Sequence, residues 1–487
     1  MTNDLTYFSS DELAYSISLE RLNLKSFRCF GDLEINFDSR LTVFIAENGG
    51  GKTTVLDAIA ECLKAYLAAL KVNGYKTNLI PNKDVKIGET YANCSLLVDI
   101  DYVSEIIEIV EQQQNAKEDN EQQQNSENEV KKEKVKKETR VREITNNVVT
   151  TIAVTTAKNE QVDEATAHFY QQAQPYKNYT KIDFPVLVYY GGNSVPVDYN
   201  DKEKTNLDKV SMVYKDALSS SRFHFTTFLN WWKEKEYDML RLRDITSPEF
   251  ITLNDQFTKL KRAIEFILND NPTDPTYTDL CINEELKMGM DKKTHDGGTQ
   301  FVEINQFSSG EKALFAFVAD LGLRLLYATP LATNIDADNA YRILGKGIVL
   351  IDEVDLHLHP KWQQKIIGKL MTIFPEVQFV VTTHSPFVVS SFVENNPTCL
   401  TYRLTDFVPK VERFGKGQSA DYVLSELMDV DTTSPIVEKY VKLLRENQHE
   451  TPEGLQLKEW IDTNIDTISG DAMRLNFALK RLKSIGK

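Results

Sequence analysis

The chain has 487 residues and a formal net charge of -16, with 41% hydrophobic and 26% charged residues. This composition is typical of a soluble globular protein, long enough for one large α/β domain with insertions or for several smaller domains. No run of about 18 apolar residues predicts a membrane span, and the N-terminus lacks the layout of a secretion signal. The five scattered cysteines favour reduced thiols and a cytoplasmic location. The negative charge argues against nucleic-acid binding over the whole surface but leaves room for a local basic groove.

The first predicted elements are two strands in residues 17–24 and 33–37, where apolar and polar residues alternate. We expect them to form a pair closed by a turn at Gly31 and Asp32. Arg28 lies between the two strands.

A glycine-rich loop, AENGGGKTT at residues 46–54, follows an apolar strand and precedes apolar residues at helical spacing. Strand, glycine loop and helix are together the context that a phosphate-binding loop requires. Three glycines let the backbone approach a polyphosphate, so that N–H groups and the helix N-terminus point at the anion: Gly49, Gly50 and Gly51. The loop therefore predicts an ATP-binding site.

Two side chains of this loop are predicted to contact the nucleotide or its metal ion. Lys52 is predicted to reach the β and γ phosphates, and the hydroxyl of Thr53 to bind Mg²⁺. Ala46 stands where such loops usually have their first glycine. Its small side chain still lets the chain leave the strand at negative φ, so we expect a slightly tightened loop.

An inserted β lobe is predicted next, with strands in residues 91–102, 140–145 and 148–156. Residues 111–140 contain EQQQN twice and a lysine-rich run, with almost no apolar residue to bury. Such a segment cannot offset its ordering entropy, which predicts a disordered or loosely helical excursion. The alternative is a charged arm that contacts a partner or nucleic acid.

The middle of the chain predicts a return to the central sheet and then a helical lobe. Residues 185–192, PVLVYYGG, form a predicted buried strand, and the pattern turns helical over residues 208–269. We interpret the aromatic residues there as the lobe's own core, with a ligand platform as the alternative. Residues 284–290 and 299–305 flank a turn-rich stretch and predict a hairpin.

Residues 347–355, GIVLIDEVD, form an apolar run that ends in two adjacent carboxylates. Such a run is typical of a buried parallel strand, and α/β sheets bind ligands at the carboxyl ends of their strands. Asp352 is predicted to hold Mg²⁺ through its water shell, and Glu353 to act as general base toward the attacking water. The HLHP that follows lacks a third ligand at metal spacing, so we do not interpret it as a zinc site.

Two other segments resemble motifs of the ABC ATPases. FSSGE resembles their signature at a helix N-terminus, with Phe307 in place of leucine, and Ser308 and the Gly310 backbone would present donors to a γ-phosphate. Residues 374–386 are predicted as another buried strand that ends in a histidine, and their TTHSP resembles the switch loop of these ATPases. The resemblance implies that His384 hydrogen-bonds the γ-phosphate.

The last segment is predicted as a short sheet element followed by helices. Three of its acids superficially suggest a Toprim nuclease: Glu426, Asp429 and Asp431. No strand precedes them and too little chain follows, so we reject that interpretation.

Taken in order, these motifs resemble the ABC ATPase class over nearly the whole chain. The long separation of Lys52 from Ser308, the HLHP segment and Arg28 in an element similar to "NFR" resemble the OLD-like and SMC-like branch. Within it, the chain resembles the PtuA ATPases of Septu-type antiphage systems and of retrons. The fold class implied is α/β, an ABC-type P-loop ATPase head with an inserted β lobe and a helical lobe.

The expected organisation follows from these motifs and insertions. It comprises an N-terminal ATPase lobe with the P-loop (1–103), a β-lobe insertion with the low-complexity segment (104–160), a return to the central sheet (161–200), a helical insertion (201–280), a C-terminal ATPase lobe (281–400) and a C-terminal helical extension (401–487).

The resemblance implies an ATP·Mg²⁺ site completed between two chains of a homodimer or higher homo-oligomer. One chain would contribute Arg28, Asn48, Gly49, Gly50, Gly51, Lys52, Thr53, Thr54, Asp352, Glu353 and His384, and the other Ser308, Gly310 and Asp355. For Arg28, an ordinary exposed strand-end cation is the alternative.

The resemblance also implies a separately encoded HNH nuclease, similar to PtuB, that the ATP-held assembly restrains. The chain would be an ATPase and not itself a nuclease. A retron reverse transcriptase with its RNA/DNA hybrid is left open as a further partner. Two rival classes are a RecF-type repair ATPase, which a salt-dependent DNA affinity would favour, and an OLD-family nuclease, which metal-dependent cleavage by the pure chain would favour.

Overall fold

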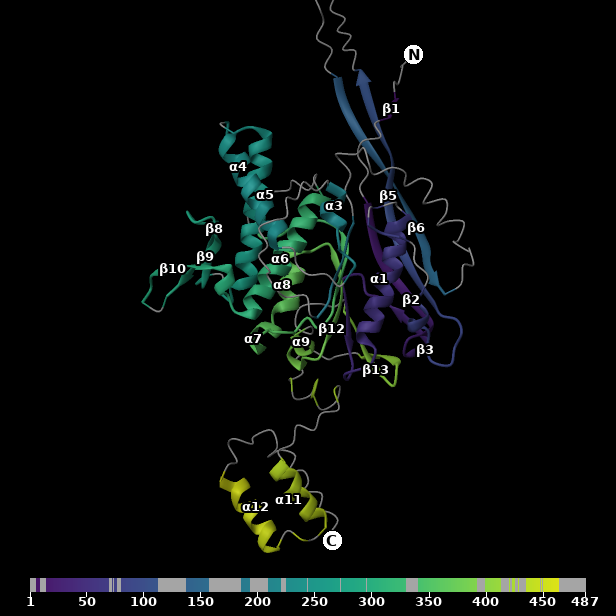
Figure 1. The fold of residues 1–487 in the computed structure, drawn as a ribbon, viewed down its shortest axis with the longest axis vertical. Helices are drawn as coiled ribbons and strands as arrows, with labels where there is room; N and C mark the ends of the chain where they lie inside the picture. The colour runs from purple at the N-terminus through teal and green to yellow at the C-terminus, as the bar shows by residue number, and fades with distance from the viewer. Residues whose placement is uncertain are drawn as a thin grey trace, which may run out of the picture. The chain divides into compact units, whose positions relative to one another are not determined.

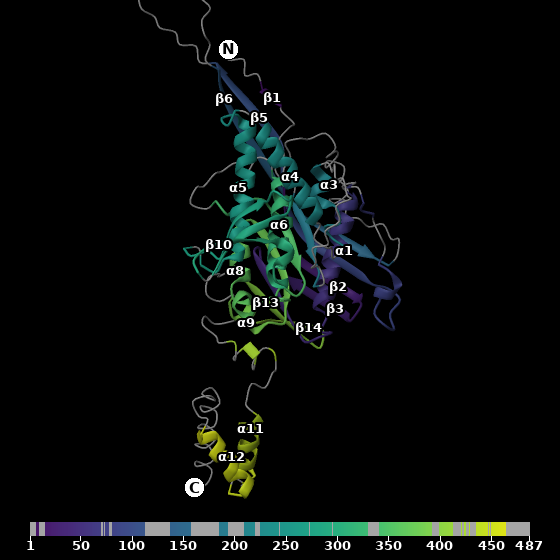
Figure 2. The ribbon, with the colours of Figure 1, turned by 60° about the vertical axis from the view of Figure 1, so that its left-hand side comes forward.

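The computed structural model describes residues 6–8, 15–112, 137–156, 185–192, 209–391, 399–412 and 420–463, apart from gaps within 70–79, 220–224, 330–339 and 421–434 and at single positions. The chain divides into two compact units, Met1–Gly417 and Gln418–Lys487. Figures 1 and 2 show the ribbon from two directions.

The larger unit is built on a six-stranded sheet in the order β14-β13-β4-β12-β11-β7. Its strands are β4 (Leu41–Ile45), β7 (Val186–Tyr190), β11 (Gly347–Ile351), β12 (Val377–Thr383), β13 (Leu400–Thr405) and β14 (Val408–Glu412). All neighbours pair in parallel except β13 and β14. Every residue of β4, β7, β11 and β12 is buried, which explains their continuous apolar runs and confirms these four predicted strands.

A second, antiparallel sheet contains β1 (Thr6–Phe8), β2 (Tyr15–Phe27), β3 (Phe30–Asn36), β5 (Asn93–Gln112) and β6 (Lys137–Thr155). The predicted pair before the P-loop is β2 and β3, but its turn lies at Arg28 and Cys29, and Gly31 falls inside β3. Arg28 adopts a positive φ of 48°, and its backbone N–H donates to the carbonyl oxygen of Asp84 at 2.8 Å. This contact with the 3-10 helix η1 (Asn82–Asp84) holds the turn earlier than predicted.

Strands β5 and β6 form one long ribbon. The two strands predicted at 140–145 and 148–156 are joined in the single strand β6, because the pairing with β5 continues through them. The ends of the predicted excursion at 111–140 are strand residues, and Gln112 pairs with Lys137. Residues 113–136 lie outside the described part of the chain.

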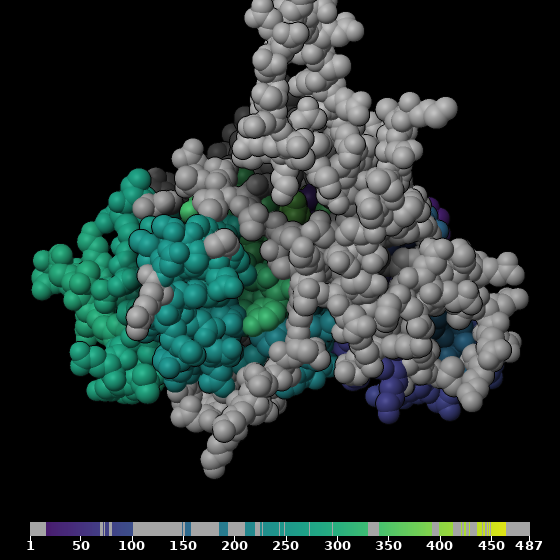
Figure 3. Space-filling model, turned by 90° about the horizontal axis from the view of Figure 1, so that it is seen from above, coloured from purple at the N-terminus to yellow at the C-terminus, as the bar shows by residue number. Residues whose placement is uncertain are grey.

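Helices flank the sheets of the larger unit. Helix α1 (Lys52–Ala69) contacts β5 and β6 of the antiparallel sheet and β7 and β12 of the six-stranded sheet. The other helices of this unit with described bounds are α3 (Lys209–Tyr214), α4 (Phe225–Arg241), α5 (Pro248–Leu268), α6 (Ser309–Ala328), α7 (Pro360–Gln363), α8 (Ile366–Ile373) and α9 (Pro386–Ser391). Seen from above, the teal surface of the helical lobe and the purple surface of the N-terminal lobe lie on opposite sides (Figure 3).

The helical lobe packs an aromatic core of its own. Trp232 lies 4.5 Å from Phe257 and 5.8 Å from Phe228 between ring centroids, and Phe228 in turn contacts Phe315 of α6. All four side chains are buried, which supports the core interpretation. A small sheet follows, with β8 (Tyr277–Ile282), β9 (Met288–Lys293) and β10 (Thr299–Glu303). Strands β9 and β10 are the predicted hairpin, and β8 adds a third strand to it.

The helical extension expected from residue 401 begins later in the structure. Residues 400–412 form β13 and β14 of the six-stranded sheet, and Tyr402 stacks on Phe44 with ring centroids 5.6 Å apart. In the second unit, α11 (Pro435–Arg445) packs against α12 (Pro452–Thr463). The three acids weighed as a Toprim centre lie outside the described residues. Among the helices that the structure describes, none combines the length and apolarity needed to cross a membrane.

Candidate functional site

The glycine-rich loop connects β4 to α1, which begins at Lys52. Gly49 and Gly51 have φ values of 78° and 93°, a region that side chains other than glycine seldom adopt. A Cβ on Gly50 would lie 2.6 Å from the Cβ of Ala46. Ala46 therefore fits at the usual position of the first glycine because residue 50 has no side chain. Asn48 is exposed in the turn of this loop.

Lys52 points into the loop. Its ammonium donates to the carbonyl oxygens of Ala46 at 2.9 Å and of Glu47 at 3.1 Å, and only 6% of the residue is exposed. Burial lowers the pKa of Lys52, and the nearby carboxylates, Asp352 first among them, oppose that shift. The loop thus encloses a cation where a polyphosphate is expected to bind.

Thr53 and Asp352 meet although 299 positions separate them in the chain. The Thr53 hydroxyl donates to Oδ2 of Asp352 at 2.8 Å, which joins the glycine loop to the end of β11. A hydroxyl and a carboxylate oxygen are the hard ligands that Mg²⁺ prefers. The two residues therefore fit the predicted magnesium site.

Glu353 has a positive φ of 53°, and its backbone N–H donates to the Thr382 hydroxyl at 2.8 Å. Its side chain packs against Gly192, which follows β7. A Cβ on residue 192 would lie 2.9 Å from Oε2 of Glu353, so only glycine leaves enough space for the carboxylate. Glu353, Tyr190 and Phe317 are among the residues that line a cavity of about 90 Å³. That space is large enough for water beside a candidate general base.

The histidine loop is anchored to the residues that follow β11. Oδ1 of Asp355 accepts from the Thr383 hydroxyl at 2.5 Å and from the backbone N–H of His384 at 3.3 Å. Gln363 bridges the same two segments, donating to the Asp355 carbonyl at 3.2 Å and accepting from the Ser385 hydroxyl at 2.8 Å. Burial and then the Lys52 ammonium lower the pKa of His384, so a neutral imidazole is favoured. The predicted role of Asp355 toward a second chain stays a prediction.

Arg28 is held by two carboxylates. Its Nη1 donates to Asp57 at 2.5 Å and its Nε to Asp84 at 2.8 Å, and the Tyr189 hydroxyl donates to the second oxygen of Asp57 at 3.1 Å. Burial favours the neutral guanidine, but these hydrogen bonds outweigh it and raise the pKa of Arg28. The residue is thus fixed beside α1 and is no solitary surface cation. Its contact with nucleotide remains a prediction. Thr54 lies near the same turn, beside Cys29.

Ser308 caps helix α6. Its hydroxyl accepts from the backbone N–H of Glu311 at 3.3 Å, and its own N–H donates to the Glu311 carboxylate at 2.7 Å. Gly310 follows in the first turn and packs against the backbone of His357. These contacts tie the predicted signature to the loop after β11 in the same chain, and action across a subunit boundary stays a prediction.

The HLHP segment has a local structural role. The side chain of His359 caps α7, where Nδ1 accepts from the backbone N–H of Lys361 at 3.3 Å. His357 adopts a positive φ of 63° in the turn before it.

The structure brings together the loop residues Lys52 and Thr53 with Asp352, Glu353 and His384. Their roles toward a nucleotide stay predictions. The structure also adds residues that the sequence did not single out: Thr382, Asp57 and Gln363. The TTH triplet was a usable signal for Thr382, because the threonine precedes a predicted site residue in a buried strand. Asp57 has no comparable signal, since its partners Arg28 and Tyr189 are distant in sequence. Gln363 lies outside every motif that the sequence analysis singled out.

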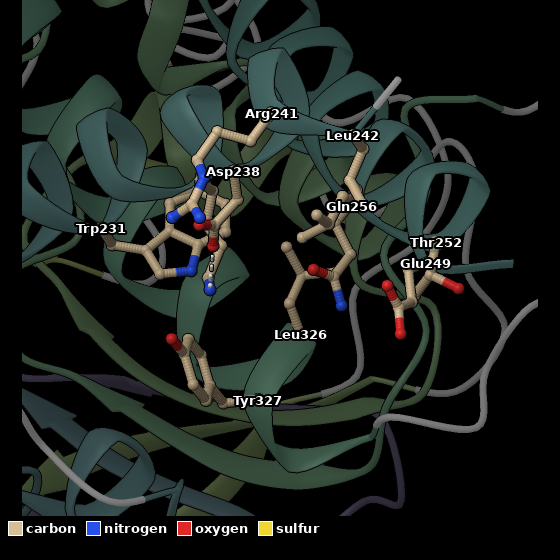
Figure 4. Close-up of a pocket in the computed structure, with 11 residues that line it drawn as sticks. Trp231, Asp238, Arg241, Leu242, Glu249, Thr252, Gln256, Leu326 and Tyr327 are labelled. Carbon is tan, nitrogen blue, oxygen red and sulfur yellow. Dashed lines mark hydrogen bonds and ion pairs between the residues drawn. The ribbon is translucent and has the colours of Figure 1, made fainter. Parts of the chain in front are cut away.

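A larger groove of about 810 Å³ lies elsewhere, among α4, α5 and α6. Trp231, Asp238 and Arg241 gather at one end, and Glu249 and Thr252 lie at the other (Figure 4). Its lining mixes both charge signs and contains none of the motif residues, so it is not the candidate nucleotide site.

Comparison with known proteins matches residues 41–390 to the family described as "AAA domain, putative AbiEii toxin, Type IV TA system". The Retron Vc95 probable ATPase of Vibrio cholerae serotype O1 biovar El Tor is 25% identical over 491 residues, covering 91% of this chain and 86% of that protein. The Retron Ec83 probable ATPase of Escherichia coli is 25% identical, covering 87% and 78%. Septu protein PtuA of Bacillus thuringiensis is 36% identical over 107 residues, covering 21% and 26%.

Proposed function

This chain belongs to the family described as AAA domain, putative AbiEii toxin, Type IV TA system, and from that membership we propose that it binds and hydrolyses ATP as the ATPase subunit of an antiphage defence system. The family match and the order of the central sheet confirm the predicted fold class, α/β with an ABC-type P-loop ATPase head. The similarity to two retron ATPases and to Septu PtuA supports the assignment to defence.

The observation that carries the ATPase proposal is the 2.8 Å hydrogen bond between Thr53 and Asp352. It joins the end of the glycine loop to the carboxyl end of β11. Glu353, the residue after Asp352, supplies a second carboxylate there. Lys52 would neutralise phosphate charge from inside the loop, and Glu353 would accept the proton of the attacking water. Thr53 and Asp352 would hold Mg²⁺, which would supply charge stabilisation for the transferred phosphoryl group.

The direct test is ATP binding and hydrolysis by the full chain and by Lys52→Ala. We expect the variant to lose nucleotide binding, because the loop loses its cation. Lys64→Ala is the matched control, since Lys64 lies on the same helix and forms a half-buried ion pair with Glu61 at 2.8 Å, away from the loop. Undiminished ATP affinity of Lys52→Ala in a direct titration would overturn the site assignment.

The proposed assembly has two parts. Two or more chains complete each other's ATP sites with Ser308 and Gly310, and the complex restrains a separately encoded HNH nuclease. Its support is the likeness to Septu PtuA and to retron ATPases, together with the exposed position of Ser308 at the start of α6. Purification from native cells, with identification of bound protein and nucleic acid, tests the partner. Metal-dependent DNA cleavage by the pure chain would contradict the assignment of nuclease activity to a partner.

A further inference from the structure

Thr382, near the end of β12, contacts three consecutive residues after β11. Its hydroxyl donates to Oδ1 of Asp352 at 2.6 Å and accepts from the backbone N–H of Glu353 at 2.8 Å. Its backbone carbonyl accepts from the N–H of Val354 at 3.0 Å. The parallel register pairs Ile351 with Val381, which sets Thr382 beside the carboxylate pair. Thr382 is fully buried, so water does not compete for these bonds.

The single proton of this hydroxyl makes its orientation unambiguous. A carboxylate only accepts and a backbone N–H only donates, so the Thr382 proton must point to Asp352 and a lone pair to Glu353. The other carboxylate oxygen of Asp352 receives the Thr53 proton. Each oxygen of Asp352 therefore has one hydroxyl donor, and both rotation and tilt of the carboxylate are fixed.

The bond to Glu353 holds an unusual backbone conformation. Glu353 has a φ of 53°, a value that costs energy for a residue with a side chain. Its N–H is anchored by Thr382, and its carboxylate is directed to the space beside Gly192. The neighbouring threonine contacts a different carboxylate, because the Thr383 hydroxyl donates to Asp355.

We propose that Thr382 is a positioning residue for ATP hydrolysis: one hydroxyl sets both the metal-holding carboxylate of Asp352 and the backbone of the general base Glu353. This inference rests on the proposed ATPase function. The three hydrogen bonds of Thr382 described above go to Asp352, Glu353 and Val354, and none of them goes to the phosphate-binding loop. Loss of the hydroxyl should therefore affect metal binding and the chemical step more than ATP binding.

The experiment compares Thr382→Val, which replaces the hydroxyl by a methyl group of similar size, with Thr382→Ser, which keeps the hydroxyl. We expect Thr382→Val to lower kcat about ten- to hundredfold, the usual scale for a lost outer partner of a metal ligand. The Kd for ATP without metal should stay within about twofold of wild type, because Lys52 and the loop are untouched. Thr382→Ser should recover most of kcat.

One further readout and one control variant separate a positioning role from a general loss of stability. Mn²⁺ affinity of the ATP-bound protein, measured by electron paramagnetic resonance, should weaken in Thr382→Val, and this requires no turnover. The matched control is Thr42→Val: Thr42 is a fully buried threonine in the adjacent strand β4, and its hydroxyl accepts from the backbone N–H of Asp38 at 3.0 Å. That variant should lose stability without a change in kcat or Mn²⁺ affinity.

The outcomes decide between the hypotheses. Wild-type kcat in Thr382→Val, or equal losses in Thr382→Val and Thr382→Ser, overturns the positioning role. If Thr382→Val does not fold, Thr382→Cys replaces it as a weak donor of similar volume, and wild-type kcat and Mn²⁺ affinity in that variant overturn the role equally. An inactive wild-type protein, or turnover that persists in Lys52→Ala, refutes the ATPase function itself and is thereby distinguished from a failure of this inference.

Discussion

Gly310 and His357 stand in direct contact: a Cβ added to Gly310 would lie 2.7 Å from the carbonyl oxygen of His357. Gly310 belongs to the first turn of α6, and His357 lies in the loop that carries the carboxylates after β11. The helix approaches this loop so closely only because residue 310 has no side chain. We therefore expect a displacement of either segment to shift the other.

Gly310→Ala should slow ATP hydrolysis about ten- to hundredfold while ATP still binds, because the methyl group forces α6 away from the loop that positions the carboxylates. Gly368→Ala is the control, since nothing lies within 4 Å of a Cβ at this exposed helical position. The control should keep its activity and gain roughly 0.5–1 kcal/mol in unfolding free energy. Equal turnover in the two variants would contradict the coupling.

Glu353→Gln should slow hydrolysis by about two to four orders of magnitude, the usual scale for a lost general base. ATP should remain bound, so an ATP-held assembly should persist in size-exclusion chromatography. Glu61→Gln, a change in a half-buried ion pair of α1, should leave hydrolysis unchanged. Wild-type turnover in Glu353→Gln would show that the base lies elsewhere.

Deleting residues 113–136 and joining Gln112 to Lys137 with a short flexible linker should leave folding and ATP hydrolysis nearly intact. The segment contains few apolar residues, and its two ends are register partners in the β5–β6 ribbon, so a short connection suffices. Closure entropy changes only slowly with loop length. A marked fall in solubility or melting temperature would show that the deleted residues are packed.

Ser308→Arg should block hydrolysis without preventing ATP binding, if Ser308 acts on the site of a second chain. Mixed with Lys52→Ala chains, it should regain part of the activity, because the heterodimer pairs one intact loop with one intact signature. Labelled pull-down confirms that subunits exchange. Exchanging mixtures no more active than either variant alone would count against a shared site in which one intact site suffices.

The stability of the nucleotide-free protein should depend on His384. Its pKa is lowered in the folded state by burial and by Lys52, so below about pH 6.5 the unfolded chain binds more protons than the folded one. The unfolding free energy should therefore fall as the pH drops from about 6.5 toward the folded pKa. His384→Gln should flatten this part of the profile in denaturant titrations. An unchanged profile would mean that His384 is not the group responsible.

The elements that could be predicted from the sequence are those whose structure depends mainly on residues that are neighbours in the chain. The strands β4, β7, β11 and β12 are buried on both faces and read as continuous apolar runs, and the glycine loop has its own composition. The turn after β2 was misplaced because its position depends on Asp84, which is distant in sequence and binds the Arg28 backbone. Gly31 and Asp32 are typical turn residues, but they are strand residues of β3 because the pairing of β3 with β2 begins at Phe30.

The candidate site was predictable as a set of groups but not as a geometry. Each motif could be found alone, and the order of the parallel strands brings them to one edge of the sheet. The links between them depend on register, which no local pattern reports. Thr382 is the clearest example, because its partners Asp352 and Glu353 lie on the neighbouring strand end.

The contacts of Gln378 in β12 bear on which truncated fragments of the chain can fold stably. Its side-chain amide pairs with both backbone groups of Leu19, accepting at 2.7 Å and donating at 3.0 Å, and also donates to the Asp38 carbonyl at 2.8 Å. The amide thus acts as an extra peptide unit that joins the antiparallel sheet to the six-stranded sheet. A fragment limited to the family-matched residues 41–390 would leave this buried amide without its partners, so we expect a stable ATPase fragment to begin before β2.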